Sequence, residues 1–247
     1  MDRAFLQAQT AAIRAGIAAT LGCDEAAFEG EQLTVVDRPD PPAWPYTAIL
    51  ATFGVGTVVS ILPELRDFAA SRSVEEDYFA LQPRYLSDLV AEAASRGQTV
   101  TAGSPALLWA LADPPPERAV PDGLALRRMD PEWMARHQQA GHFRNAVGRS
   151  VSRGGRNYYA YALLDPAGEP AAIAGVFHTY GLHEIGVDVL RPHRGRGLAN
   201  VVVSAAARAI LEEGNTPLYG CGADNTRSQR TALACGFIPV ASDATIA

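Results

Sequence analysis

Residues 191–202 read RPHRGRGLANVV, with three arginines and two glycines in the first seven positions before the sequence turns apolar. Polar residues then recur every fourth position, which predicts an amphipathic helix over 198–213 that Gly214 closes. Apolar and polar residues alternate over 183–190, which predicts a strand just ahead of the loop. A strand, a glycine-rich loop and a helix therefore follow one another in this part of the chain.

The composition of this loop favours an anionic ligand. The first turn of a helix has N–H groups that no helix carbonyl can accept from, and the helix dipole adds partial positive charge there. Gly195 and Gly197 allow close approach of the backbone, while Arg194 and Arg196 supply full charge. A diphosphate suits this combination. The alternative is a solvated turn, and neither a P-loop nor a complete dinucleotide motif is present.

The flanking sequence predicts further elements of a mixed sheet. Asp130 is expected to cap a helix over 130–147 that has Pro131 at its first position. Short turns between successive strands predict an antiparallel meander. The expected strands are 124–128, 158–164, 171–180, 183–190, 217–222 and 237–240, and a last helix is expected over 226–235.

The first half of the chain predicts a smaller α+β domain. Apolar spacing indicates helices over 3–21 and around 85–93, and strands are expected at 33–36 and within 47–62. Four prolines within ADPPPERAVPDG, residues 112–123, are incompatible with a helix or a central strand. We therefore predict one domain over residues 1–120 and a second over 121–247.

Composition limits the classes of function. The 247 residues carry a net charge of −6, which argues against generic nucleic-acid binding. Three cysteines, an odd number without metal-ligand spacing, indicate reduced thiols in the cytoplasm, and no signal peptide is recognised. The uncharged stretch 44–63 contains glycines and threonines, which favours buried strands over a membrane span.

Two motifs together resemble the GNAT acyltransferase superfamily. The family pattern of Arg or Gln, two residues, Gly, one residue and then Gly or Ala is matched by Arg194, Gly197 and Ala199. Farther on, DNTRSQRTALACGF supplies an Asn that opens a helix and a Gly-Phe pair that ends it, Asn225, Gly236 and Phe237. The resemblance covers residues 124–240 and implies an α+β fold with a mixed central sheet, in which two parallel strands splay apart.

The resemblance also implies acetyl-CoA as cofactor and assigns residues to it. The pantetheine arm would lie between strands 183–190 and 217–222, held by the backbone of Val189 and Leu190. Asn225 and Ser228 would lie near the pantetheine or its sulfur. The pyrophosphate would be bound by the loop and helix start, Arg194, Gly195, Arg196, Gly197, Leu198 and Ala199.

Two carboxylates on strand 183–190 are candidates for acid–base chemistry. Glu184 and Asp188 share a face about 13 Å apart at strand rise, too far for a close pair. Glu184 is the candidate general base, because some family members carry a glutamate there. Ala232 stands where many members have a tyrosine acid, which leaves the acid unassigned, with Ser228 and Tyr219 as candidates. No metal site is expected.

These observations leave three functional hypotheses. The first is an N-acetyltransferase that moves an acetyl group to a primary amine of a small molecule or peptide by direct transfer. The second is a non-catalytic acyl-CoA-binding or regulatory protein, which Ala232 favours. Nucleic-acid binding through the arginine-rich loops is the third and least favoured, and no membrane partner is expected. The N-terminal domain is expected to shape the acceptor pocket or to form a homodimer.

Smaller signals concern the acceptor. The segment SRGGR, residues 152–156, could together with Arg144 contact a substrate carboxylate, although a surface loop is the simpler interpretation. His178 and His183 flank the turn at Gly181 and could line the acceptor site.

Overall fold

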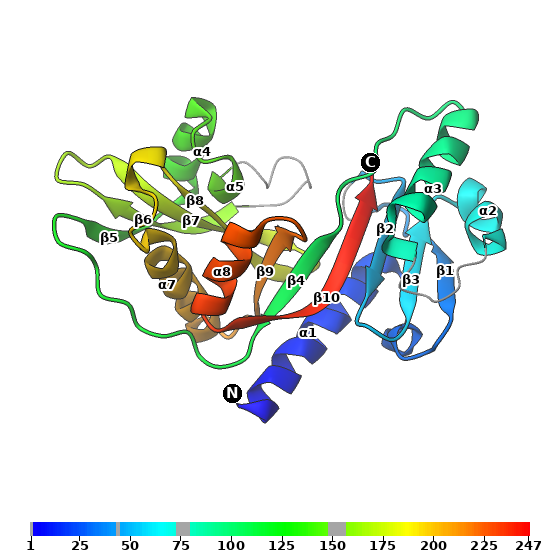
Figure 1. The fold of residues 1–247 in the computed structure, drawn as a ribbon, viewed down its shortest axis with the longest axis horizontal. Coiled ribbons are helices and arrows are strands. Elements are labelled where there is room, and N and C mark those ends of the chain that lie inside the picture. Colours follow the sequence, from blue (N-terminus) through cyan, green and yellow to red (C-terminus); the bar gives the residue numbers. More distant parts are fainter. Residues whose placement is uncertain (1, 43–44, 73–79, 148–156) are drawn as a thin grey trace. The chain divides into compact units, whose positions relative to one another are not determined.

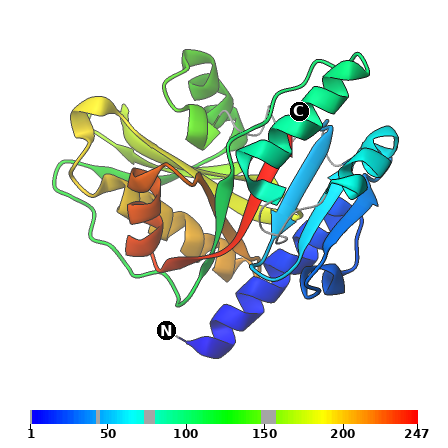
Figure 2. The same ribbon diagram turned by 45° about the vertical axis from the view of Figure 1, so that its right-hand side comes forward.

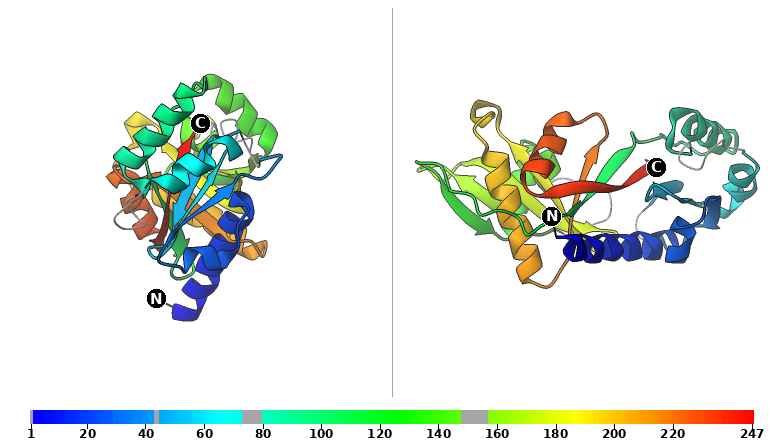
Figure 3. Two further views of the ribbon diagram at one scale, coloured as in Figure 1. Left: turned by 90° about the vertical axis from the view of Figure 1, so that its right-hand side faces the viewer. Right: turned by 60° about the horizontal axis from the view of Figure 1, so that its bottom comes forward.

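The computed structural model describes residues 2–42, 45–72, 80–147 and 157–247, and Figure 1 shows its ribbon. The first helix is unbroken over its nineteen residues (Figure 3). The helices and 3-10 turns are α1 (Arg3–Leu21), η1 (Glu25–Phe28), η2 (Pro63–Leu65), α2 (Arg66–Ser71), α3 (Pro83–Ser95), α4 (Pro131–Ala140), α5 (Arg144–Val147), η4 (Arg191–His193), α7 (Leu198–Glu212) and α8 (Thr226–Ala234). The strands are β1 (Leu33–Asp37), β2 (Ala48–Thr52), β3 (Thr57–Ile61), β4 (Ala106–Leu111), β5 (Ala125–Met129), β6 (Asn157–Leu164), β7 (Pro170–Thr179), β8 (Leu182–Val189), β9 (Pro217–Gly222) and β10 (Phe237–Ile246).

The chain forms two compact units. Unit 1 comprises Met1–Gln9, Trp109–Gly220 and Thr226–Ile238, and unit 2 comprises Thr10–Leu108, Cys221–Asn225 and Pro239–Ala247. Strand β10, red in Figure 2, starts in unit 1 and ends in unit 2. The predicted domains 1–120 and 121–247 describe segments that would fold alone, and they stay a prediction. The two compact units have other boundaries, because a strand such as β10 contributes residues to both of them.

Unit 2 contains a mixed sheet in the order β1-β3-β2-β10. Strand β2 is antiparallel to both β3 and β10, whereas β1 is parallel to β3. One face packs against α2 and α3, where Tyr85, Leu86 and Leu89 are buried against Leu50 and Val59. The uncharged stretch is therefore a pair of buried strands over the part that is described. No helix in the described ranges is long and apolar enough to cross a membrane.

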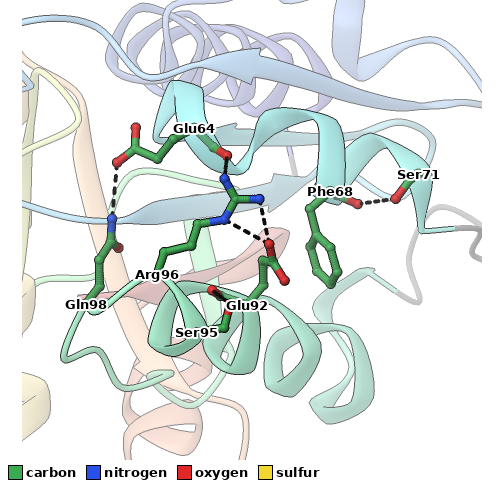
Figure 4. Close-up of polar contacts among 7 residues, drawn as sticks. All are labelled: Glu64, Phe68, Ser71, Glu92, Ser95, Arg96 and Gln98. Carbon is green, nitrogen blue, oxygen red and sulfur yellow. Dashed lines mark hydrogen bonds and ion pairs between the residues drawn. The ribbon is translucent and has the colours of Figure 1, made fainter.

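Arg96 ties the end of α3 to η2 (Figure 4). Its guanidinium donates to the Glu92 carboxylate from Nε at 2.8 Å and from Nη2 at 2.6 Å, and Nη1 donates to the carbonyl of Glu64. Gln98 donates to the Glu64 side chain at 3.1 Å. These contacts tie the residues at and just after the end of α3 to Glu64 in η2.

Unit 1 contains the meander that the turns predict. Strands β5, β6, β7 and β8 pair antiparallel in sequence order, and β9 is parallel to β8. Beyond β9 lie β4 and then the start of β10. Helix α7 packs against one face of β6–β8, and α4 and α5 cover the other (Figure 1). This is the expected mixed sheet flanked by helices.

Two predictions of secondary structure need correction. The helix expected over 130–147 is two helices, because Gly141 adopts a φ of 73° and caps α4. The predicted N-cap is confirmed, since the Asp130 side chain accepts from the Trp133 N–H at 2.7 Å. The strand expected over 237–240 continues to Ile246 by pairing with β2, a contact that local sequence does not indicate.

Replacing Arg96 by Ala should lower the free energy of unfolding by about 1 kcal/mol, because it removes a two-pronged ion pair and a hydrogen bond to a backbone carbonyl. Urea unfolding monitored by circular dichroism would measure the change. Arg84→Ala, on the exposed start of the same helix, is the matched control and should have less than half the effect. Equal effects would show that the Arg96 contacts do not stabilise the unit.

Candidate cofactor-binding site

The parallel pairing of β8 with β9 is short. The ladder contains three residue pairs, His183 with Pro217, Glu184 with Leu218 and Ile185 with Tyr219. Strand β8 then continues for four residues to Val189, still paired with β7 on its other side. Within the described residues, the last four residues of β8 therefore present one edge without a strand partner. The two strands form a fork that opens after Ile185 and Tyr219.

The alternation of hydrogen bonds in the β7–β8 ladder decides which groups face this gap. Leu190 donates its N–H to the carbonyl of Ala171 at 3.0 Å, so its backbone points toward β7. In an antiparallel pair the neighbouring residues point the other way. Val187 and Val189 therefore direct their N–H and C=O groups toward the gap. Val187 was missed from the sequence, although alternation within the strand could have indicated it.

The loop after β8 brings backbone donors to the start of α7. Gly195 and Gly197 have φ values of 79° and 73°, in the left-handed region where glycine is favoured. No backbone carbonyl of the described residues accepts from the N–H groups between Gly195 and Ala199. The loop from Arg194 to Gly197 is exposed, whereas Leu198 is buried as the first residue of the helix. The predicted anion-binding arrangement of N–H groups is thus present in the backbone.

The two loop arginines behave differently. Arg194 turns back along the strand and donates from Nε to the carbonyl of Val189 at 3.1 Å. Arg196 points to His193, with 3.3 Å between Nη1 and Nδ1. Arg194 thus braces the loop against the strand end, while Arg196 remains the more available charge for a ligand.

Glu184 and Asp188 lie on the same face of β8 but in different surroundings. Glu184 is 1% exposed and lies at the closed end of the fork, in register with Phe177. Asp188 accepts three hydrogen bonds from the start of α5: the N–H and side-chain amide of Asn145, each at 2.7 Å, and the N–H of Ala146 at 2.9 Å. Asp188 is therefore engaged in holding α5 to the sheet.

Two facing glycines make room for α5. Gly175 on β7 is the register partner of Gly186 on β8. A Cβ at Gly175 would lie 1.6 Å from the carbonyl oxygen of Ala146, and one at Gly186 would lie 2.0 Å from that of Asn145. The backbone of α5 therefore rests directly on the strands, between Glu184 and Asp188.

The opposite face of the fork carries a pair of hydroxyls. Tyr219 is 1% exposed, and its phenolic oxygen lies 2.8 Å from Oγ of Ser228 on α8. Ala232, one turn farther along α8, is fully buried. Asn225 immediately precedes this helix and donates its N–H to the carbonyl of Gly222 at 2.9 Å.

The two histidines are neighbours at the other end of β8. His178 and His183 are register partners, and the ring of His183 stacks on Tyr158 with 4.5 Å between centroids. Burial lowers the pKa of His183, the charge of His178 lowers it further, and Glu213 acts against both. Their side chains share the face opposite to Glu184, so they do not join that carboxylate.

The remaining candidates from the sequence, which are metal ligands and the arginines near α5, do not form a site in the described residues. Among the described residues, no group of three or more His, Cys, Asp or Glu side chains could hold a metal ion. Arg144 is exposed at the start of α5, and the segment SRGGR, with Arg153 and Arg156, lies outside the described residues.

Replacing Gly186 by Ala should lower the free energy of unfolding by about 3 kcal/mol, because the methyl group would displace α5 from the sheet. Thermal unfolding would measure the loss. The control is Gly30→Ala, where an added Cβ meets nothing within 4 Å. Similar melting temperatures for the two variants would contradict the close packing of α5.

The comparisons with known proteins concern the C-terminal part and the fold. A family model described as FR47-like protein matches residues 166–243, while no curated protein matches the sequence at a significant level. Among solved structures, a Drosophila protein aligns with a TM-score of 0.51 and 19% identity over 67% of this chain. The aligned part is 57% of the Drosophila chain.

Two further structures are similar at lower TM-scores. A putative acetyltransferase of the GNAT family from Novosphingobium aromaticivorans has a TM-score of 0.43 and 22% identity over 60% of this chain and 66% of its own. A tandem GNAT protein from the clavulanic acid biosynthesis pathway has 0.44 and 23% over 64% and 57%. Residues 166–243 thus match the FR47-like family model, and the Drosophila structure shows a similar fold.

Proposed function

We propose that the protein is an acetyl-CoA-dependent N-acetyltransferase that acts on a primary amine of a small molecule or peptide. The fork between β8 and β9 carries the proposal, because its open edge leads directly into the loop and helix start from Gly195 to Ala199. None of the five N–H groups there donates to a backbone carbonyl of the described residues. A ligand with an extended arm that ends in a diphosphate matches both features: the arm fits the open strand edge, and the diphosphate fits the N–H groups. The FR47-like domain supports acyl transfer as the class of reaction.

The residues present fit the cofactor. Val187 and Val189 direct backbone groups toward the gap, as an added strand requires. The start of α7 offers donors and a favourable dipole for the diphosphate, and Arg196 adds positive charge. Val189, Gly195, Arg196, Gly197, Leu198 and Ala199 would hold the cofactor, with Arg194 as a brace. Asn225 and Ser228 stay predicted contacts, whereas the predicted backbone contact of Leu190 is corrected, because its N–H points toward β7 and donates to Ala171. When bound, acetyl-CoA supplies an activated acetyl group as a thioester.

The chain must provide a base and a place for the amine. An ammonium group cannot attack a carbonyl, so a proton must first be removed. Glu184 lies at the closed end of the fork on the face that α5 covers, and its carboxylate would take this proton directly or through water. Asp188 and the paired glycines hold α5 beside it, so α5 would form one wall of the acceptor site.

The non-catalytic alternative has one observation in its favour. Ala232 is fully buried and has no side-chain proton to donate where the superfamily often has a tyrosine. A scaffold that binds acyl-CoA without turnover would have the same loop. Binding and turnover therefore need separate measurements.

Arg196→Ala should weaken acetyl-CoA binding about tenfold, because a charge-assisted hydrogen bond contributes roughly 1.5 kcal/mol. Isothermal titration calorimetry with acetyl-CoA would measure the dissociation constants. Arg84→Ala, which removes the same charge from an exposed position on α3, is the control and should bind as the wild type does. Absence of binding to the wild type would refute the proposed cofactor.

Glu184→Gln should lower the acetyl-transfer rate at least a hundredfold while acetyl-CoA affinity is retained, since the substitution preserves shape and removes the base. The assay is thiol release over a library of primary amines at several pH values, and the residual rate should rise with pH as the amine deprotonates itself. Cofactor binding by the wild type with no transfer to any amine would favour the non-catalytic alternative. Transfer by the variant at the wild-type rate would remove Glu184 from the mechanism.

A further inference from the structure

A proton must reach the leaving sulfur in the proposed reaction, and the fork indicates where this occurs. The gap extends along β8 from Val189 to Ile185, about 13 Å at strand rise. An arm anchored by its diphosphate at the start of α7 can enter the gap only as far as the pair Ile185–Tyr219, where the strands are joined again. Its sulfur end would therefore lie beside Tyr219.

The Tyr219 side chain lies on a defined face of the sheet at this point. Tyr219 is the parallel register partner of Ile185, so the two side chains share a face, and Glu184 points to the other. Ser228 approaches Tyr219 from α8, with 2.8 Å between the two hydroxyl oxygens. Tyr219 and Ser228 both belong to unit 1.

A tyrosine hydroxyl suits this task. Its ordinary pKa near 10 makes it a much stronger acid than a serine hydroxyl, and close to a thiol with its pKa near 8.5. A serine hydroxyl that donates to the phenolic oxygen would stabilise the phenolate left after proton transfer. Burial of the ring keeps the hydroxyl in one position, and Ala232, one turn after Ser228, has no side-chain proton of its own to donate.

We propose that Tyr219 is the general acid of the reaction and that Ser228 is its positioning residue; the assignment rests on the proposed function. The amine nitrogen bonds to the acetyl carbon, and Glu184 removes the amine proton. The carbon–sulfur bond breaks with its electron pair on sulfur, and the Tyr219 hydroxyl gives its proton to that sulfur. Solvent restores the phenolic proton and accepts the proton held by Glu184, so both residues return to their starting states and the products are an amide and free coenzyme A.

The arrangement separates the two proton transfers across the sheet. Glu184 lies on the face covered by α5, whereas Tyr219 and Ser228 lie on the face of α8. An incoming amine and a departing thiolate occupy different directions around the carbonyl carbon. Base and acid on opposite faces can therefore act in one reaction without neutralising each other.

The experiment uses free coenzyme A, which needs no acceptor. The pKa of its thiol in the complex is measured by ultraviolet absorbance of the thiolate during a pH titration, and affinity is measured by calorimetry at neutral pH. A hydroxyl that donates to the sulfur stabilises the thiolate, so the wild type should bind the thiol with a pKa below about 8.5. Tyr219→Phe should raise that pKa by about one unit and slow acetyl transfer at least tenfold, with coenzyme A affinity at neutral pH unchanged.

Two further variants test whether the change in thiol pKa is specific to the Tyr219–Ser228 pair. Ser228→Ala should produce a smaller pKa change in the same direction, and Tyr161→Phe, on β6, should produce none. Unchanged thiol pKa values in Tyr219→Phe with normal coenzyme A affinity would overturn the assignment and leave the proposed function intact. No binding of coenzyme A by the wild type would overturn both.

Discussion

Three residue pairs join β8 to β9, and the end of this ladder after Ile185 and Tyr219 is the constraint on which the site depends. Pairing on one side fixes β8 through its whole length to β7. Separation on the other side leaves backbone groups of Val187 and Val189 directed into a gap. The same strand leads into the loop and the start of α7, so the position of the fork determines where the loop and the N-terminus of α7 lie.

Helix α5 depends on the same region of the sheet. The facing glycines remove the side chains that would keep a helix at its ordinary distance from a sheet, and the Asp188 carboxylate replaces the missing helical acceptors at the N-terminus of α5. Asp188, one of the two carboxylates that the sequence offered for acid–base chemistry, thus binds the N-terminus of α5. Glu184, two positions before Gly186, remains the acidic residue at the closed end of the fork.

Local signals and the pairing of strands joined by short turns could be predicted, whereas contacts between segments far apart in the sequence could not. The Asp130 cap, the loop glycines and the helix after them follow from neighbouring residues, and the structure has them. Strand β4 was missed because ALLWAL is a short apolar run whose period does not distinguish strand from helix. The partnership of Gly175 with Gly186, and of Tyr219 with Ser228, requires register and helix placement that no local pattern contains.

The bond from Arg194 to the carbonyl of Val189 has a consequence for solubility. An unpaired strand edge is a template on which another chain can add a strand, and such edges promote aggregation. The guanidinium places a charged group over the last carbonyl of that edge, which a foreign strand would have to displace. A ligand that carries its own negative charge can compensate the arginine when it takes its place, whereas a neutral peptide strand cannot. The Arg194 side chain would thus favour an anionic ligand over a neutral peptide strand at this edge.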